Sequence, residues 1–152
     1  INFKDLTPIL ANPQVFSALV DSMSKFEFCY NSDALIAIDA RGFIFGTAIA
    51  VKLSKPLILA RKPGKLPGEL ITDSYNLEYG SNSLSIQKSS INSFESFTII
   101  DDLLATGGTV ACVERMLLNN KKKVLGISVV VELLSLSGRS NLCSSVESQI
   151  KI

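Results

Sequence analysis

The chain has 152 residues, of which 47% are hydrophobic and 19% are charged, a composition typical of one compact globular domain, residues 1–152. Its formal net charge is +1, so electrostatics gives no reason to expect a nucleic-acid or membrane partner. Histidine is absent, which excludes imidazole bases and imidazole metal ligands and leaves carboxylates, lysine, tyrosine, backbone groups or an oxygen-bound metal for any catalysis.

The apolar pattern predicts a regular succession of helices and strands. Asn12 and Pro13 form a helix start signal, and the apolar residues that follow have helical spacing. Short apolar runs without polar alternation predict strands that are buried on both faces. In chain order the elements are a helix over 12–26, a strand over 34–39, a helix over 42–53, strands over 57–61 and 97–101, a helix over 107–120 and a strand over 124–133.

Repetition of strand, turn and helix predicts an α/β fold, a parallel β-sheet flanked by helices on both faces. In such sheets ligands bind beyond the carboxyl ends of the strands, where the strand order reverses. Polar residues follow the predicted strands at these ends: Asp39, Arg41, Arg61, Asp101, Asp102 and Glu132.

Residues 62–90 break this pattern, with two prolines, three glycines and charges of both signs, followed by residues whose alternation is typical of a hairpin. A connection of this length is usually functional or disordered. We therefore expect a flexible β-hairpin lid over 62–90.

The three cysteines, Cys29, Cys112 and Cys143, have no CxxC spacing, which indicates reduced thiols rather than a disulfide framework or a zinc site. No apolar run reaches the roughly 18 residues that a membrane-spanning helix needs. We therefore expect a cytoplasmic protein with no membrane partner.

The stretch ATGGT (Ala105, Thr106, Gly107, Gly108 and Thr109) immediately precedes a helical pattern. It predicts a helix N-terminus with open N–H groups, where glycines let the backbone close around an anion and threonine hydroxyls add donors. Neither GxxxxGK[ST] nor GxGxxG is matched, so the stretch is not an ATPase-type or dinucleotide-binding loop.

The adjacent acids Asp101 and Asp102 would repel a phosphate unless they face something else. Carboxylates suit sugar hydroxyls or a hydrated magnesium ion. A ribose with a 5-phosphate satisfies both features, with the phosphate in the glycine turn and the hydroxyls on the acids. The alternative is that both acids only cap the loop and the helix.

IIDDLLATGGT (99–109) resembles the phosphoribosyl-pyrophosphate signature of type I phosphoribosyltransferases. Three further stretches, FKDLTP (3–8), IDARGFIFG (38–46) and RKPGKLPGE with YNLEYG (61–80), narrow the resemblance to the adenine phosphoribosyltransferases. The resemblance implies a Rossmann-like type I fold with a small hood, residues 1–12. It also implies purine salvage by transfer of 5-phosphoribose from 5-phosphoribosyl-1-pyrophosphate to adenine, giving AMP and pyrophosphate with Mg²⁺.

The resemblance also implies roles for particular residues, namely Glu78 as acid–base catalyst, Arg41 at the pyrophosphate as a second catalytic residue, and Phe3 and Lys4 at adenine. Arg61, Lys62 and Lys65 add positive charge for pyrophosphate, and because some of these cations reach a neighbouring site in related enzymes, a homodimer is implied. Magnesium is expected to be held mainly by substrate, with no direct protein ligands. For Lys62, Lys65 and Glu78 the alternative is an ordinary surface charge.

Two other functions are alternatives to adenine phosphoribosyl transfer. The first is the same fold acting on hypoxanthine, guanine or xanthine, against which FKDLTP and YNLEYG argue. The second is a phosphoribosyl-pyrophosphate sensor that controls transcription, which would carry a separate and typically basic DNA-binding domain. The length of 152 residues and the charge of +1 argue against such a domain.

Overall fold

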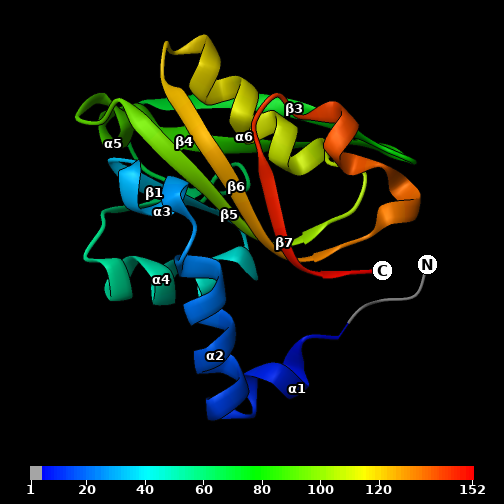
Figure 1. The fold of residues 1–152 in the computed structure, drawn as a ribbon. Coiled ribbons are helices and arrows are strands. Elements are labelled where there is room, and N and C mark those ends of the chain that lie inside the picture. The colour runs from blue at the N-terminus through cyan, green and yellow to red at the C-terminus, as the bar shows by residue number, and fades with distance from the viewer. Residues whose placement is uncertain (1–4) are drawn as a thin grey trace.

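A computed structural model describes residues 5–152 and shows one parallel five-stranded sheet in the order β2-β1-β5-β6-β7 (Figure 1). Its strands are β1 (Ala34–Ile38), β2 (Leu57–Ala60), β5 (Ser96–Leu104), β6 (Lys123–Glu132) and β7 (Val146–Lys151). The chain passes from β1 to β2 on one side and later enters β5 on the other side. The strand order therefore reverses between β1 and β5, where a ligand crevice is expected.

Helices cover both faces of the sheet, which confirms the predicted α/β fold (Figure 1). One face carries α2 (Pro13–Ser24) and α4 (Gly42–Leu53), and the other carries α6 (Gly108–Asn119). The remaining helical segments are short: α1 (Thr7–Leu10), α3 (Glu27–Asn31), α5 (Lys88–Asn92), and the 3-10 turns Leu134–Leu136 and Gly138–Asn141. Across residues 5–152, no helix has both the length and the apolar character to cross a membrane.

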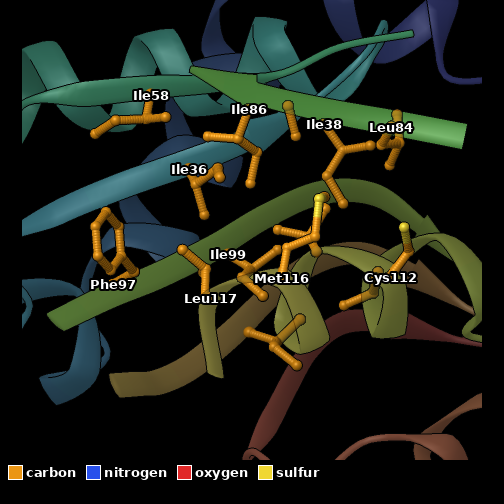
Figure 2. Close-up of a cluster of buried hydrophobic side chains, with 14 of the residues drawn as sticks. Ile36, Ile38, Ile58, Leu84, Ile86, Phe97, Ile99, Cys112, Met116 and Leu117 are labelled. Carbon is orange, nitrogen blue, oxygen red and sulfur yellow. The ribbon is translucent and has the colours of Figure 1, made fainter. Parts of the chain in front are cut away.

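The core consists of two apolar clusters, one on each face of the sheet. In β1 the side chains alternate between them, so Ile36 and Ile38 join the cluster under α6 while Leu35 and Ala37 join the cluster under α2 and α4. Figure 2 shows the first cluster, in which sheet residues meet side chains of α6 and of a hairpin formed by β3 (Leu70–Leu77) and β4 (Gly80–Gln87). Each fully buried Leu or Ile side chain stabilises the fold by about 1.5–3 kcal/mol. This two-sided burial explains why the strand sequences are continuously apolar.

Strand β5 differs from the prediction because it continues past Asp101 to Leu104. The extension exists because β6 runs alongside it, with Leu103 paired to Val131 and Leu104 paired to Glu132. The two acids are therefore residues of the strand itself and are held in its register.

Residues 62–90 contain an antiparallel hairpin of β3 (Leu70–Leu77) and β4 (Gly80–Gln87). Leu84 and Ile86 are buried in the first cluster, and the backbone of Ser85 pairs with that of Arg61. The base of the hairpin is thus anchored to the core, and its turn at Glu78 and Tyr79 is exposed. The flexible lid over 62–90 remains a prediction.

The predicted hood, residues 1–12, is described from residue 5 onward. Leu6 packs into the second cluster, and α1 follows it and contacts α2. Phe3 and Lys4, assigned to adenine from the resemblance, lie outside the described residues.

Candidate active site

A cavity of about 380 Å³ lies at the carboxyl ends of β1 and β5, where the strand order reverses. It is lined by the β1–α4 turn, the end of β5, the glycine turn before α6 and two hairpin residues. The lining residues are Asp39, Ala40, Arg41, Lys62, Tyr75, Asn82, Asp101, Asp102, Leu103, Leu104, Ala105, Thr106, Gly107, Gly108, Thr109 and Val110. The structure thus brings Arg41, Lys62, both acids and the whole ATGGT stretch to one cavity.

The β1–α4 turn lies directly against the end of β5. The peptide bond between Asp39 and Ala40 is cis, and Gly42 begins α4. A Cβ at Gly42 would lie 2.8 Å from Asp101 Oδ1 and 3.2 Å from the Ile100 carbonyl oxygen. Only glycine lets the two segments approach this closely, so Gly42 sets the distance between the turn and the acids.

Asp101 and Asp102 are both buried, with 7% and 6% of their surface exposed. Arg41 Nε lies 2.7 Å from Asp102 Oδ2 in an ion pair. The backbone N–H of Asp102 donates to Asp101 Oδ1 over 2.9 Å. The two carboxyl groups therefore have different partners, although they are neighbours in the chain.

Burial raises the pKa of Asp101 well above its ordinary value, and the adjacent negative charge of Asp102 raises it further. Asp102 is paired with Arg41, so the positive guanidinium offsets one of the two carboxyl groups that border the cavity. This arrangement explains how two adjacent acids can border a site for a phosphorylated ligand.

The glycine turn gives α6 an open N-terminus. Gly107 has φ 84°, a left-handed conformation, and among residues 5–152 no side chain caps the helix there. The first N–H groups of a helix have no intrahelical partners, so those at the start of α6 are available to an anion. Thr106 and Thr109 line the same cavity and can add hydroxyl donors.

The predicted cations separate into two groups. Arg41 and Lys62 line the cavity, whereas Arg61 and Lys65 do not. Arg61 Nε lies 3.2 Å from Asp39 Oδ2 and its guanidinium stacks over the ring of Phe43 at 5.6 Å. Lys65 is exposed on the connection between β2 and β3.

Glu78 lies in the exposed turn of the hairpin and is not among the cavity-lining residues. Sequence analysis gave no role to Tyr75 or Asn82, yet both line the cavity. They are paired across β3 and β4, on the same face as the paired residues Ile71 and Ile86. Alternation along the hairpin, counted from those two isoleucines, is the signal that could have found them.

No group of three or more His, Cys, Asp or Glu side chains that could hold a metal ion occurs within residues 5–152. Magnesium usually keeps several waters and binds through one or two carboxylates together with substrate phosphates. The buried acids at 101 and 102 fit a magnesium ion of that kind, which would arrive with a phosphorylated ligand.

The phosphoribosyl transferase domain family matches residues 6–148. The adenine phosphoribosyltransferase of Prochlorococcus marinus (strain MIT 9211) is 60% identical over 150 residues, which cover 99% of this chain and 87% of that protein. The adenine phosphoribosyltransferase of Mycoplasmopsis pulmonis is 46% identical over 153 residues, covering 100% of this chain and 89% of that protein.

Solved structures agree with this match. The adenine phosphoribosyltransferase of Thermoanaerobacter pseudethanolicus superposes with a TM-score of 0.94 at 37% identity, covering 100% of this chain and 89% of that chain. The Saccharomyces cerevisiae enzyme, solved with an imino-altritol bisphosphate and adenine, gives a TM-score of 0.84 at 33% identity, covering 97% of this chain and 86% of that chain. The chain therefore belongs to the phosphoribosyl transferase domain family and, within it, to the adenine phosphoribosyltransferases.

Proposed function

We propose that the protein transfers 5-phosphoribose from 5-phosphoribosyl-1-pyrophosphate to N9 of adenine. The bond from ribose C1 to the pyrophosphate oxygen breaks, the bond from C1 to N9 forms, and the N9 proton is removed. One observation carries the proposal: the open N-terminus of α6 and the two buried acids face the same cavity. A ribose 5-phosphate needs this combination of anion site and hydroxyl acceptors.

In this proposal the 5-phosphate accepts hydrogen bonds from the backbone of residues 105–109 and from the threonine hydroxyls. The ribose 2- and 3-hydroxyls lie against Asp101 and Asp102. Both acids sit on β5 and are fixed by its pairing with β6, so the sugar is held by a rigid part of the fold.

Arg41 is proposed to bind the pyrophosphate end of the donor. As the C1–O bond breaks, negative charge grows on pyrophosphate and positive charge grows on the sugar. The Arg41 side chain is 39% exposed, pairs with Asp102 and lines the cavity, so a phosphate could share its guanidinium. Lys62 lines the same cavity and adds a second cation.

Arg61 and Lys65 do not line the cavity, and they are proposed to contact pyrophosphate from its surroundings, in part across a homodimer interface. The dimer itself is a proposal that follows from the resemblance. Sedimentation velocity at micromolar concentration tests it, with a dimer expected and a monomer under assay conditions contradicting it.

Glu78 is proposed to accept the N9 proton when the hairpin turn closes over the base. Closure would remove water from the carboxylate and bring it to the cavity. Phe3 and Lys4 are proposed to contact adenine by stacking and through backbone groups.

Magnesium, held by the donor and by water contacts to Asp101 or Asp102, would neutralise charge on the departing pyrophosphate. We also place the protein in the cytoplasm, because all three cysteines are free thiols. Burial raises the pKa of Cys29 to about 12 and that of Cys112 to about 11, so both are unreactive core residues.

The test of this function is nucleotide formation from 5-phosphoribosyl-1-pyrophosphate and magnesium with adenine, hypoxanthine, guanine or xanthine. AMP from adenine alone is the expected result. Product from a different base would contradict the adenine assignment but keep the donor site. Donor binding without any product would indicate a sensor.

A further inference from the structure

The glycine turn that receives the phosphate is bordered by open space on two sides. A second cavity, of about 470 Å³, shares Tyr75, Thr106 and Gly108 with the first. The position of the backbone N–H groups of the turn therefore depends on the contacts that the turn makes on its remaining sides.

These contacts come from residues 137–144, which we call the supporting segment. Gly138 packs flat against the turn: a Cβ on Gly107 would lie 2.5 Å from the Gly138 carbonyl oxygen, and a Cβ on Gly138 would collide with the Ala105 carbonyl oxygen. Close approach of the two backbones thus requires glycine on both sides. The side-chain amide of Asn141 donates to the Thr106 carbonyl oxygen over 2.7 Å.

The supporting segment is itself tied to rigid elements. Arg139 makes two hydrogen bonds to the buried carboxylate of Glu132 on β6, at 2.5 and 2.7 Å, and donates to the Val146 carbonyl oxygen at 2.6 Å. The buried carboxylate of Glu114 on α6 accepts from the backbone N–H groups of Cys143 and Ser144 at 3.0 and 2.8 Å. The segment is therefore fixed to the sheet and to α6 on either side of Asn141.

We propose that Asn141 is a positioning residue for the donor 5-phosphate. Its amide holds the Thr106 carbonyl oxygen on the side of the second cavity, and because the C=O and N–H of a trans peptide group point in opposite directions, the Gly107 N–H points away from Asn141. The inference rests on the proposed function, because it assigns Asn141 to the same donor site. Asn141 is not among the residues that line the first cavity.

The test compares Asn141→Ala with wild-type enzyme in AMP formation, with Ser140→Ala as the matched control. Ser140 belongs to the supporting segment, but its hydroxyl donates to the Ser137 carbonyl oxygen and not to the glycine turn. The donor KM of Asn141→Ala should rise roughly three- to tenfold, the effect of one lost hydrogen bond. Its kcat and its KM for adenine should stay within about twofold, because Asn141 does not approach the reacting atoms. Ser140→Ala should match wild type.

Inhibition by two fragments of the donor, ribose 5-phosphate and pyrophosphate, separates positioning from a general loss of structure. Ribose 5-phosphate carries the 5-phosphate without pyrophosphate, so its inhibition constant should rise with the donor KM in Asn141→Ala. The inhibition constant of pyrophosphate should not change. Equal weakening of both inhibitors, or an unchanged donor KM, would overturn the proposal.

Asn141→Asp keeps the test valid if the alanine variant folds poorly. Aspartate has nearly the same size, cannot donate when ionised and places a negative charge beside the turn. Its donor KM should rise more than that of Asn141→Ala, and an unchanged value would contradict the proposal. If the wild-type protein forms no nucleotide at all, the proposed function fails first, which is distinct from these outcomes.

Discussion

Asp101 shows at the scale of one residue how a binding site can reduce stability. The unfolded chain releases the Asp101 proton near the ordinary pKa of 3.8. The folded protein holds this proton to a higher pH, because burial raises the pKa of Asp101. Between these two values the unfolded state binds fewer protons, so the free energy of unfolding falls as pH rises. This loss is complete only above the raised pKa.

Asp101→Asn should therefore raise the melting temperature at neutral pH, and the gain should vanish below the ordinary pKa of aspartate. Thermal unfolding across this pH range measures the effect. Asp33→Asn is the control of opposite sign, because backbone N–H groups of Glu95 and Ser96 lower the pKa of Asp33 and stabilise its charged form. An Asp101→Asn variant that is less stable than wild type at neutral pH would contradict this description.

Glu78 should affect the rate of the transfer step more than the binding of the donor. If its carboxylate accepts the N9 proton, Glu78→Gln should reduce kcat by about 10²–10⁴-fold, the usual contribution of a general base. The donor KM should change much less, because Glu78 lies outside the donor cavity. Glu27→Gln, at an exposed glutamate on α3, serves as control. An unaffected rate in Glu78→Gln would make Glu78 a surface residue.

At the scale of elements, one ion pair joins the hairpin to the helix that begins at the phosphate turn. Arg115 Nε on α6 lies 2.7 Å from Asp73 Oδ2 on β3, and Arg115 also donates to the Ser74 carbonyl oxygen at 2.9 Å. The hydrogen bond from Arg115 lowers the pKa of Asp73, so this contribution to stability is lost as pH falls through that lowered pKa.

Arg115→Ala should lower the free energy of unfolding by only about 0.5–1.5 kcal/mol, because both partners are partly exposed and the pair is screened by solvent. Urea unfolding at neutral pH measures this change, and Asp73→Asn should give a smaller one because the bond to Ser74 remains. At a pH below the lowered pKa of Asp73, the difference between Asp73→Asn and wild type should disappear. A difference that persists there would show that the ion pair is not its source.

The long elements could be predicted from the sequence because their signals are local. Asn12 caps α2 by accepting from the Val15 N–H at 3.1 Å, as the start signal indicated. Strand β7 has no continuous apolar run and is a strand because it pairs with β6, for example Val146 with Ile127. Short helices such as α3 and α5 were not predicted for the same reason, since tertiary contacts rather than local propensity stabilise them.

The candidate site was predictable to the same degree. ATGGT and the acids are contiguous, so one stretch of chain carries them. The pairing of Arg41 with Asp102 and that of Arg61 with Asp39 join segments distant in sequence, and neither follows from a local pattern. The contact of Asn141 with Thr106 is of the same kind, because it depends on how the segment after β6 folds back.

At the scale of the whole molecule, stability depends on apolar clusters on both faces of one sheet. Ile99 is fully buried in the cluster under α6 (Figure 2). Ile99→Ala should lower the free energy of unfolding by about 2–5 kcal/mol, because apolar burial is lost and a cavity is left behind. Chemical denaturation measures this change. The control is Leu118→Ala, because the Leu118 side chain is 43% exposed. Equal effects of the two substitutions would show that the core is not organised as described.

We propose that the donor sugar binds at the carboxyl end of β5. The donor KM of a variant that combines Asp101→Asn with Asp102→Asn tests this binding most directly. Replacing both carboxylates should raise the donor KM by at least about tenfold, because charge-assisted hydrogen bonds to the ribose are lost. The KM for adenine should change little, and circular dichroism should show an intact fold. A donor KM equal to that of wild type would contradict the assignment of this cavity to the ribose.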